Sequence, residues 1–116
     1  MIAVSCFSIR VSLSSPRLEV FKDCVERIYH ETCRRYRCSR LKPLLVISSG
    51  KCVMLMRPAL LEADKLSTLR PPGGLAPLLY IDIACRDPND LADITDYLSS
   101  LSNREECRDI VWRTID

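Results

Sequence analysis

The fold is decided between Phe7 and Arg37, where the chain reads FSIRVSLSSPRLEVFKDCVERIYHETCRRYR. Apolar and polar residues alternate from Phe7 to Leu13, the pattern of a strand with one buried face, and we expect that strand over roughly residues 2–13. Pro16, preceded by two serines, is typical of a helix start, because serine can cap free N–H groups and proline suits the first turn. The helix is predicted to run to about Arg37, with one apolar stripe made of Leu18, Phe21, Val25, Ile28, Thr32 and Tyr36.

The middle of the chain predicts a β-hairpin followed by a break in the sheet. Two apolar runs, residues 44–47 and 52–56, flank a turn that contains glycine, and continuous apolar runs are typical of central strands. A short helix is expected from Pro58 to Leu69. Residues 70–77 contain three prolines and two glycines, so we expect a surface loop there.

The last third of the chain predicts a strand, a helix and a final strand. Apolar residues alternate over 79–85, and Asp87 is typical of the cap of a helix whose stripe is Leu91, Ile94, Leu98 and Leu101. For residues 104–116, the sequence is compatible with either a strand or a helix. Their β-branched and aromatic residues favour a strand, whereas Glu106 also suits a capping box at the start of a helix.

This order of elements predicts a single α+β domain over residues 1–116. We expect a ferredoxin-like two-layer sandwich, with a mostly antiparallel sheet and helices on one face. The length suits one hydrophobic core. No uncharged apolar run approaches the ~18 residues that a membrane-spanning helix needs, so a membrane protein is not expected. The fold class hosts binding proteins and enzymes alike, and it therefore does not predict the function.

The chain has seven cysteines, an odd number that leaves at least one without a partner inside the chain. Cys6, Cys24, Cys52 and Cys85 lie in apolar segments and are expected in the core. Cys33 and Cys38 are expected to be more accessible, or to be crosslinked. The first residues have no basic start of a secretory signal, which predicts a cytoplasmic protein. The absence of Gln also fits a thermophile, whose cytosol tolerates disulfides.

Basic residues concentrate in the first half of the chain. Residues 1–57 hold eleven Lys or Arg against four Asp or Glu, while residues 58–116 hold six against eleven. The run RRYRCSRLK at residues 34–42 has five cations and no acid. Cations at a helix end also complement its dipole, so simple solvation explains part of this pattern.

A basic helix face that leads into a basic loop is what binding to a phosphate backbone requires. The sequence therefore predicts a nucleic-acid-binding module, more typical of RNA, that acts as an accessory subunit of a ribonucleoprotein assembly. The candidate contact residues are Arg27, His30, Arg34, Arg35, Arg37, Arg40 and Lys42. No cofactor is expected.

Other functions have weaker support in the sequence. His30, Cys33 and Cys38 lack the fourth ligand and the close cysteine spacing of a zinc site, so no metal is expected. Catalysis is not expected, because no nucleophile–base pair or phosphate loop is recognisable, and a small-molecule-binding or enzyme domain is a remote alternative. The main alternative is a protein-interaction or oligomerisation module, in which a sheet edge or residues 70–77 would dock a protein partner or a second copy.

Overall fold

The computed structural model describes residues 6–41, 44–62 and 75–115 of the chain. In chain order, its elements are β1 (Phe7–Ser14), α1 (Leu18–Arg35), β2 (Arg37–Leu41), β3 (Leu44–Ser48), β4 (Cys52–Glu62), β5 (Leu75–Cys85), α2 (Pro88–Ser102), the 3-10 turn η2 (Glu105–Cys107) and β6 (Val111–Ile115). None of the helices in these ranges is long and apolar enough to cross a membrane.

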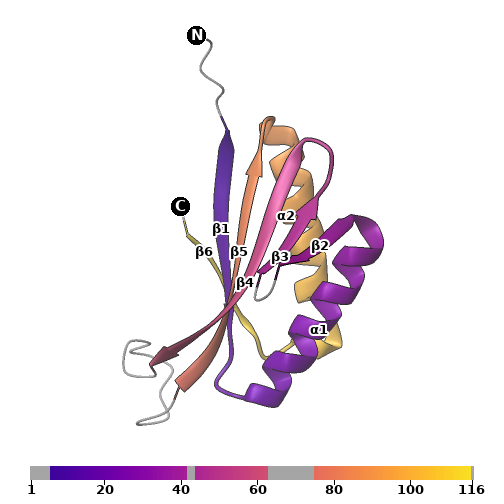
Figure 1. Ribbon diagram of the computed structural model, residues 1–116. Helices are drawn as coiled ribbons and strands as arrows, with labels where there is room; N and C mark the ends of the chain where they lie inside the picture. Colours follow the sequence, from indigo (N-terminus) through magenta and orange to yellow (C-terminus); the bar gives the residue numbers. More distant parts are fainter. Residues whose placement is uncertain (1–5, 42–43, 63–74, 116) are drawn as a thin grey trace.

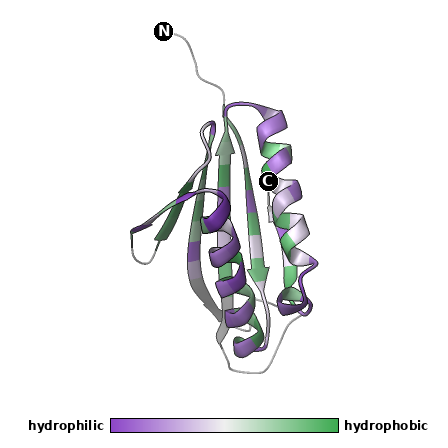
Figure 2. Cartoon of the chain, turned by 90° about the vertical axis from the view of Figure 1, so that its right-hand side faces the viewer, coloured by the Kyte–Doolittle hydropathy of each residue, from purple (hydrophilic) through white to green (hydrophobic). Residues whose placement is uncertain are grey.

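The six strands form one sheet in the order β2-β3-β4-β5-β1-β6 (Figure 1). Every pair of neighbouring strands is antiparallel. Both helices lie against the same face of this sheet (Figure 2). The predicted α+β class, the antiparallel sheet and the helices on one face are therefore confirmed. A ferredoxin-like sandwich is not confirmed, because the sheet has six strands.

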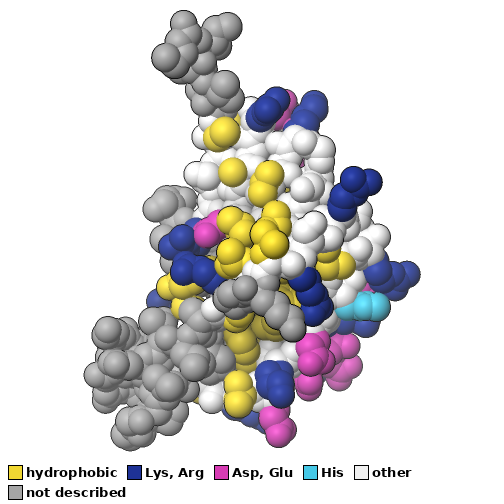
Figure 3. All heavy atoms as spheres, in the orientation of Figure 1, with side chains coloured by type: hydrophobic (Ala, Val, Ile, Leu, Met, Phe, Trp, Pro, Cys, Tyr) yellow, Lys and Arg dark blue, Asp and Glu magenta, His cyan; other side chains and the backbone are white. Residues whose placement is uncertain are grey.

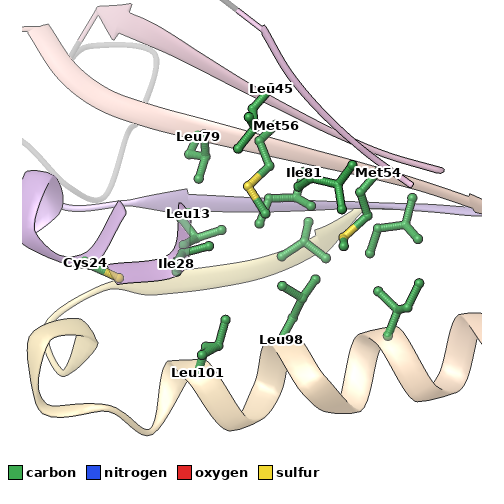
Figure 4. Close-up of a cluster of buried hydrophobic side chains, with 14 of the residues drawn as sticks. Leu13, Cys24, Ile28, Leu45, Met54, Met56, Leu79, Ile81, Leu98 and Leu101 are labelled. Carbon is green, nitrogen blue, oxygen red and sulfur yellow. The ribbon is translucent and has the colours of Figure 1, made fainter. Parts of the chain in front are cut away.

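The core lies between the sheet and the two helices (Figure 4). Successive side chains of a strand point to opposite faces, so the alternating residues of β1, β4 and β5 send one apolar set towards the helices. Leu13, Met54, Met56, Leu79 and Ile81 belong to this set and are fully buried. The helices supply the opposite wall. Phe21, Ile28 and Thr32 of the predicted α1 stripe are buried beside Cys24, which was not part of the predicted stripe, whereas Leu18 of the stripe is exposed. The stripe of α2 buries Ile94, Leu98 and Leu101.

The first helix ends two residues earlier than expected, and the segment expected to be a basic loop is the edge strand β2. Arg37 pairs with Ser48 and Leu41 with Leu44, so the backbone of this segment is bonded to β3. An edge strand buries few side chains, so polar and charged residues are common in it. Such a strand lacks the alternation of apolar residues by which strands are recognised in a sequence.

The expected helix from Pro58 is also wrong in the part that the structure describes. β4 continues through Pro58 to Glu62, because Ala59–Glu62 pair with Leu75–Leu78 of β5. Residues 63–69 of that helix lie outside the described residues, as do residues 70–74 of the expected loop. Residues 75–77 of the loop belong to β5.

The end of the chain follows one of the two structures left open by the sequence. β6 is a strand that pairs with Arg10–Ser14 of β1, and η2 is a single short turn before it. The predicted cap of α2 is present, since the side chain of Asp87 accepts a 2.8 Å hydrogen bond from the backbone N–H of Asn89. These two elements were recognisable because their signals are local.

Six cysteines form three disulfides: Cys24–Cys107, Cys33–Cys38 and Cys52–Cys85. The expected crosslink within the basic segment is therefore confirmed. Cys24, Cys52 and Cys85 are buried as predicted, although they are paired rather than free. The prediction for Cys6 is wrong, because this free thiol is exposed, one residue before the sheet begins.

These environments predict an order of thiol labelling. In native protein without reductant, we expect iodoacetamide to modify Cys6 alone. A low concentration of dithiothreitol should next open Cys33–Cys38, because Cys33 is exposed whereas the sulfurs of the other two disulfides are buried. Peptide mass mapping against time measures this order. Modification of Cys52 or Cys107 before Cys33 would contradict it.

Candidate nucleic-acid interface

The end of α1 brings two of the basic residues that the sequence singles out to one surface depression. Arg34 and Arg35 lie in the last turn of α1, and together with Arg104, just after α2, they line one surface depression. Glu31 is the one acid on its wall, and it lies 3.5 Å from the guanidinium of Arg27. The depression therefore presents three guanidinium groups and one carboxylate that already has a cationic neighbour.

Two tyrosines hold Arg35 in place. Its guanidinium carbon lies 4.8 Å from the ring centre of Tyr97 and 5.6 Å from that of Tyr36. Its Nε donates a 3.1 Å hydrogen bond to the Tyr36 hydroxyl. The two rings meet edge to face, with their centres 5.6 Å apart. These contacts fix a flexible side chain before any ligand arrives, which reduces the entropy lost on binding.

Tyr97 does not bring negative charge to this cluster at neutral pH. Burial raises the pKa of the Tyr97 hydroxyl, which also lies 3.5 Å from the hydroxyl of buried Thr32. Because protonated Tyr97 is neutral, it does not cancel the positive charge of the Arg35 guanidinium that rests on its ring. The cation–π contact therefore orients Arg35 without neutralising it.

Arg37 and Arg40 extend the basic surface onto β2. They pair with Ser48 and Leu45 of β3, and both are exposed on the edge of the sheet. The Cys33–Cys38 disulfide, with 5.4 Å between the two Cα atoms, ties β2 to the last turn of α1. The disulfide thus fixes β2 to the end of α1, although Arg37 and Arg40 do not line the depression itself. We call Arg34, Arg35, Arg37, Arg40 and Arg104 the arginine cluster.

The remaining candidates lie elsewhere or outside the described residues. The Nε of Arg27 is 3.5 Å from a carboxylate oxygen of Glu31 and 3.9 Å from one of Glu106, so acids surround it. His30 lines a separate depression that also contains Asp23, Glu26 and Glu106. Lys42 is not among the described residues. The structure therefore places Arg27 and His30 in an acidic setting outside the depression lined by Arg34 and Arg35, which Arg27 adjoins only through Glu31.

Sequence reasoning missed Arg104 and Tyr97. Both belong to the α2 region, more than 60 residues from Arg34, and the half of the chain that contains them is acidic overall. Only the packing of α1 against α2 brings them to the cluster. The sequence does not mark Arg104 as a binding residue, because a single arginine after a helix is common and complements the helix dipole.

Two further features that the sequence raised are a metal site at His30, Cys33 and Cys38 and a partner-docking loop at residues 70–77. Cys33 and Cys38 form a disulfide, so their sulfurs are not free thiolates for a metal, and within the described ranges no three His, Cys, Asp or Glu side chains are grouped to hold one. Most of the loop expected to dock a partner, residues 70–74, lies outside the described residues. Comparison with protein-family models, with curated proteins and with solved structures gave no match.

Proposed function

We propose that this chain is an RNA-binding module of a larger assembly and that it contacts the phosphate backbone through the arginine cluster. The observation that carries the proposal is the convergence of Arg34, Arg35 and Arg104 around one depression. A phosphate bound there would meet several charge-assisted hydrogen bonds at once, and arginine presents its donors in a planar fork that suits phosphate oxygens.

The arrangement supports more than solvation of a helix end. Cations that only complement a helix dipole need no fixed geometry, whereas Arg35 is held by two aromatic rings and β2 is tied to α1 by a disulfide. Binding of a polyanion benefits from such preorganisation, since fewer side-chain rotamers are lost when the complex forms.

The disulfides also support a proposal for the compartment. Three disulfides in a chain of this size favour an oxidising setting over the reducing cytoplasm of a mesophile. The secretory route and the cytosol of a hyperthermophile both meet this requirement. Binding assays should therefore use oxidised protein without a thiol reductant.

The test is a triple substitution, Arg34→Ala with Arg35→Ala and Arg104→Ala. We expect weaker binding to a single-stranded RNA of mixed sequence, and a slope of log affinity against log salt that is shallower by about 2, because each lost phosphate contact removes about 0.7. Fluorescence anisotropy across a salt series measures both quantities. The physical reason is the release of fewer counterions from the RNA when fewer phosphates are neutralised.

The matched control is Arg17→Ala with Arg86→Ala and Arg108→Ala. It removes the same total charge from three exposed arginines outside the arginine cluster. We expect this control to keep most of the slope. Equal losses in the two triple variants would show that net charge alone governs binding. An unchanged slope in the first variant would remove the arginine cluster from the mechanism. Thermal melting of each variant verifies that it remains folded.

A further inference from the structure

The sheet face opposite the helices has its own arrangement of flat and charged side chains. We call this surface the open sheet face. Tyr80 of β5 lies between two arginines, with the guanidinium carbon of Arg10 at 4.9 Å from its ring centre and that of Arg57 at 5.1 Å. Arg57 is directly opposite Tyr80 in the pairing of β4 with β5. Three planar groups therefore lie together on three neighbouring strands.

Arg10 is fixed in this arrangement by Asp82. The two residues are directly opposite in the pairing of β1 with β5. The Arg10 Nε donates to one carboxylate oxygen at 2.5 Å, and its second nitrogen donates to the other oxygen at 3.1 Å. This two-point contact sets the plane of the guanidinium group. A planar group in a fixed orientation can stack against a flat ligand.

An apolar depression adjoins these planar groups. It has a volume of about 420 Å³, and its walls include Val53, Leu55 and Ala84 together with Arg10 and Asp82. The side chain of Val53 is unusually accessible for an apolar strand residue, since the residue is 48% exposed. Figure 3 shows apolar side chains gathered at the middle of one view of the molecule, with charged side chains at their border. The volume falls in the range of small-ligand sites.

The charge of the open sheet face favours an anionic occupant. The strand register places four arginines on it, Arg10, Arg37, Arg57 and Arg113, and Asp82 is the one acid among its described strand residues. A second copy of the same face would bring like charges together, which opposes self-association. Arg37 is the one member of the arginine cluster that the strand register places on this face, because Arg40 lies opposite buried Leu45 and faces the helices.

We propose that the open sheet face stacks the unpaired bases of single-stranded RNA. The guanidinium planes of Arg10 and Arg57 are the stacking groups, Tyr80 is the ring that orients both, and the Val53–Leu55 depression is the seat of a base. This proposal rests on the proposed function and extends it to a substrate class. Aromatic rings and guanidinium planes stack on the flat faces of bases that a duplex keeps covered. The arginine cluster then neutralises the phosphates of the same strand.

The decisive variant is Tyr80→Leu, and Tyr80→Phe is its matched control. Fluorescence anisotropy would compare a 12-nucleotide oligouridylate with the duplex that it forms with oligoadenylate. We expect wild type to prefer the single strand, and Tyr80→Leu to weaken single-strand binding about tenfold while leaving duplex binding and the salt slope unchanged. Tyr80→Phe should bind as wild type does, because it retains the ring.

The outcomes separate the two proposals. Loss of single-strand binding in Tyr80→Leu, with normal binding in the arginine-cluster triple variant, would support the open sheet face and overturn the arginine cluster. The reverse result would support the cluster and overturn the stacking proposal. Equal losses of single-strand and duplex binding in Tyr80→Leu, or a loss in Tyr80→Phe of the same size, would also overturn stacking. No binding of either RNA by wild type would overturn both.

Discussion

Replacing Cys24 and Cys107 together by alanine is expected to lower the free energy of unfolding by about 4.5 kcal/mol, because their disulfide closes the longest loop in the chain. The two residues are 83 positions apart, and a crosslink restricts the unfolded chain more strongly as the enclosed loop lengthens. For a domain of this size, the loss corresponds to a fall in melting temperature of roughly 15 °C. Urea denaturation of the oxidised protein measures the free energy.

Two further variants make this prediction specific. Alanine at Cys33 and Cys38 removes a crosslink between residues only five positions apart, so the expected loss is about 2 kcal/mol. Cys6→Ala removes the exposed thiol and should leave stability unchanged. The entropic explanation fails if the Cys33–Cys38 variant loses as much stability as the Cys24–Cys107 variant.

Leu79→Ala is expected to destabilise the protein by about 3 to 4 kcal/mol, since it deletes buried methyl groups and leaves a cavity in the core. Leu79 is fully buried in β5, where it lies opposite Leu13 of β1 and Pro58 of β4. Two neighbouring strands and the packed helices limit how far the surroundings can collapse into the space. Urea denaturation measures the loss at equilibrium.

The matched control for Leu79→Ala is Val53→Ala on the open sheet face. Val53 is half exposed, so truncation removes little buried surface, and we expect a loss below about 1 kcal/mol. A loss at Val53 as large as that at Leu79 would show that the open sheet face is covered in solution. The pair of variants therefore tests the assignment of the two faces as well as the core.

The sequence predicted the elements whose signals are local. Three such signals are the apolar stripe of α1, the Asp87 cap of α2 and the alternation in β1 and β5. Each is formed by residues that are close together in the sequence. The extension of β4 beyond Pro58 was missed, because its cause is pairing with residues 75–78, which are distant in the chain. A proline that suits a helix start is also tolerated within this strand once such pairing is available.

The candidate site was predictable to the same extent. Arg34, Arg35, Arg37 and Arg40 stand out as a run of cations, and the Cys33–Cys38 disulfide joins residues close in sequence. Arg104 and Tyr97 reach the cluster only through packing of α1 against α2. Arg10, Arg57 and Tyr80 of the proposed stacking site come from three strands, and only the register places them together.

The Cys24–Cys107 disulfide has a mechanical consequence for the whole chain. It closes a covalent ring that contains every element from β2 to α2, while β1 and β6 lie outside the ring and beside each other in the sheet. A tensile force applied to the two chain ends would therefore separate β6 from β1, strip β1 from β5, unwind the first turns of α1 and then load the disulfide directly. The ring would bear no force, so stretching the ends would leave the remaining four strands paired.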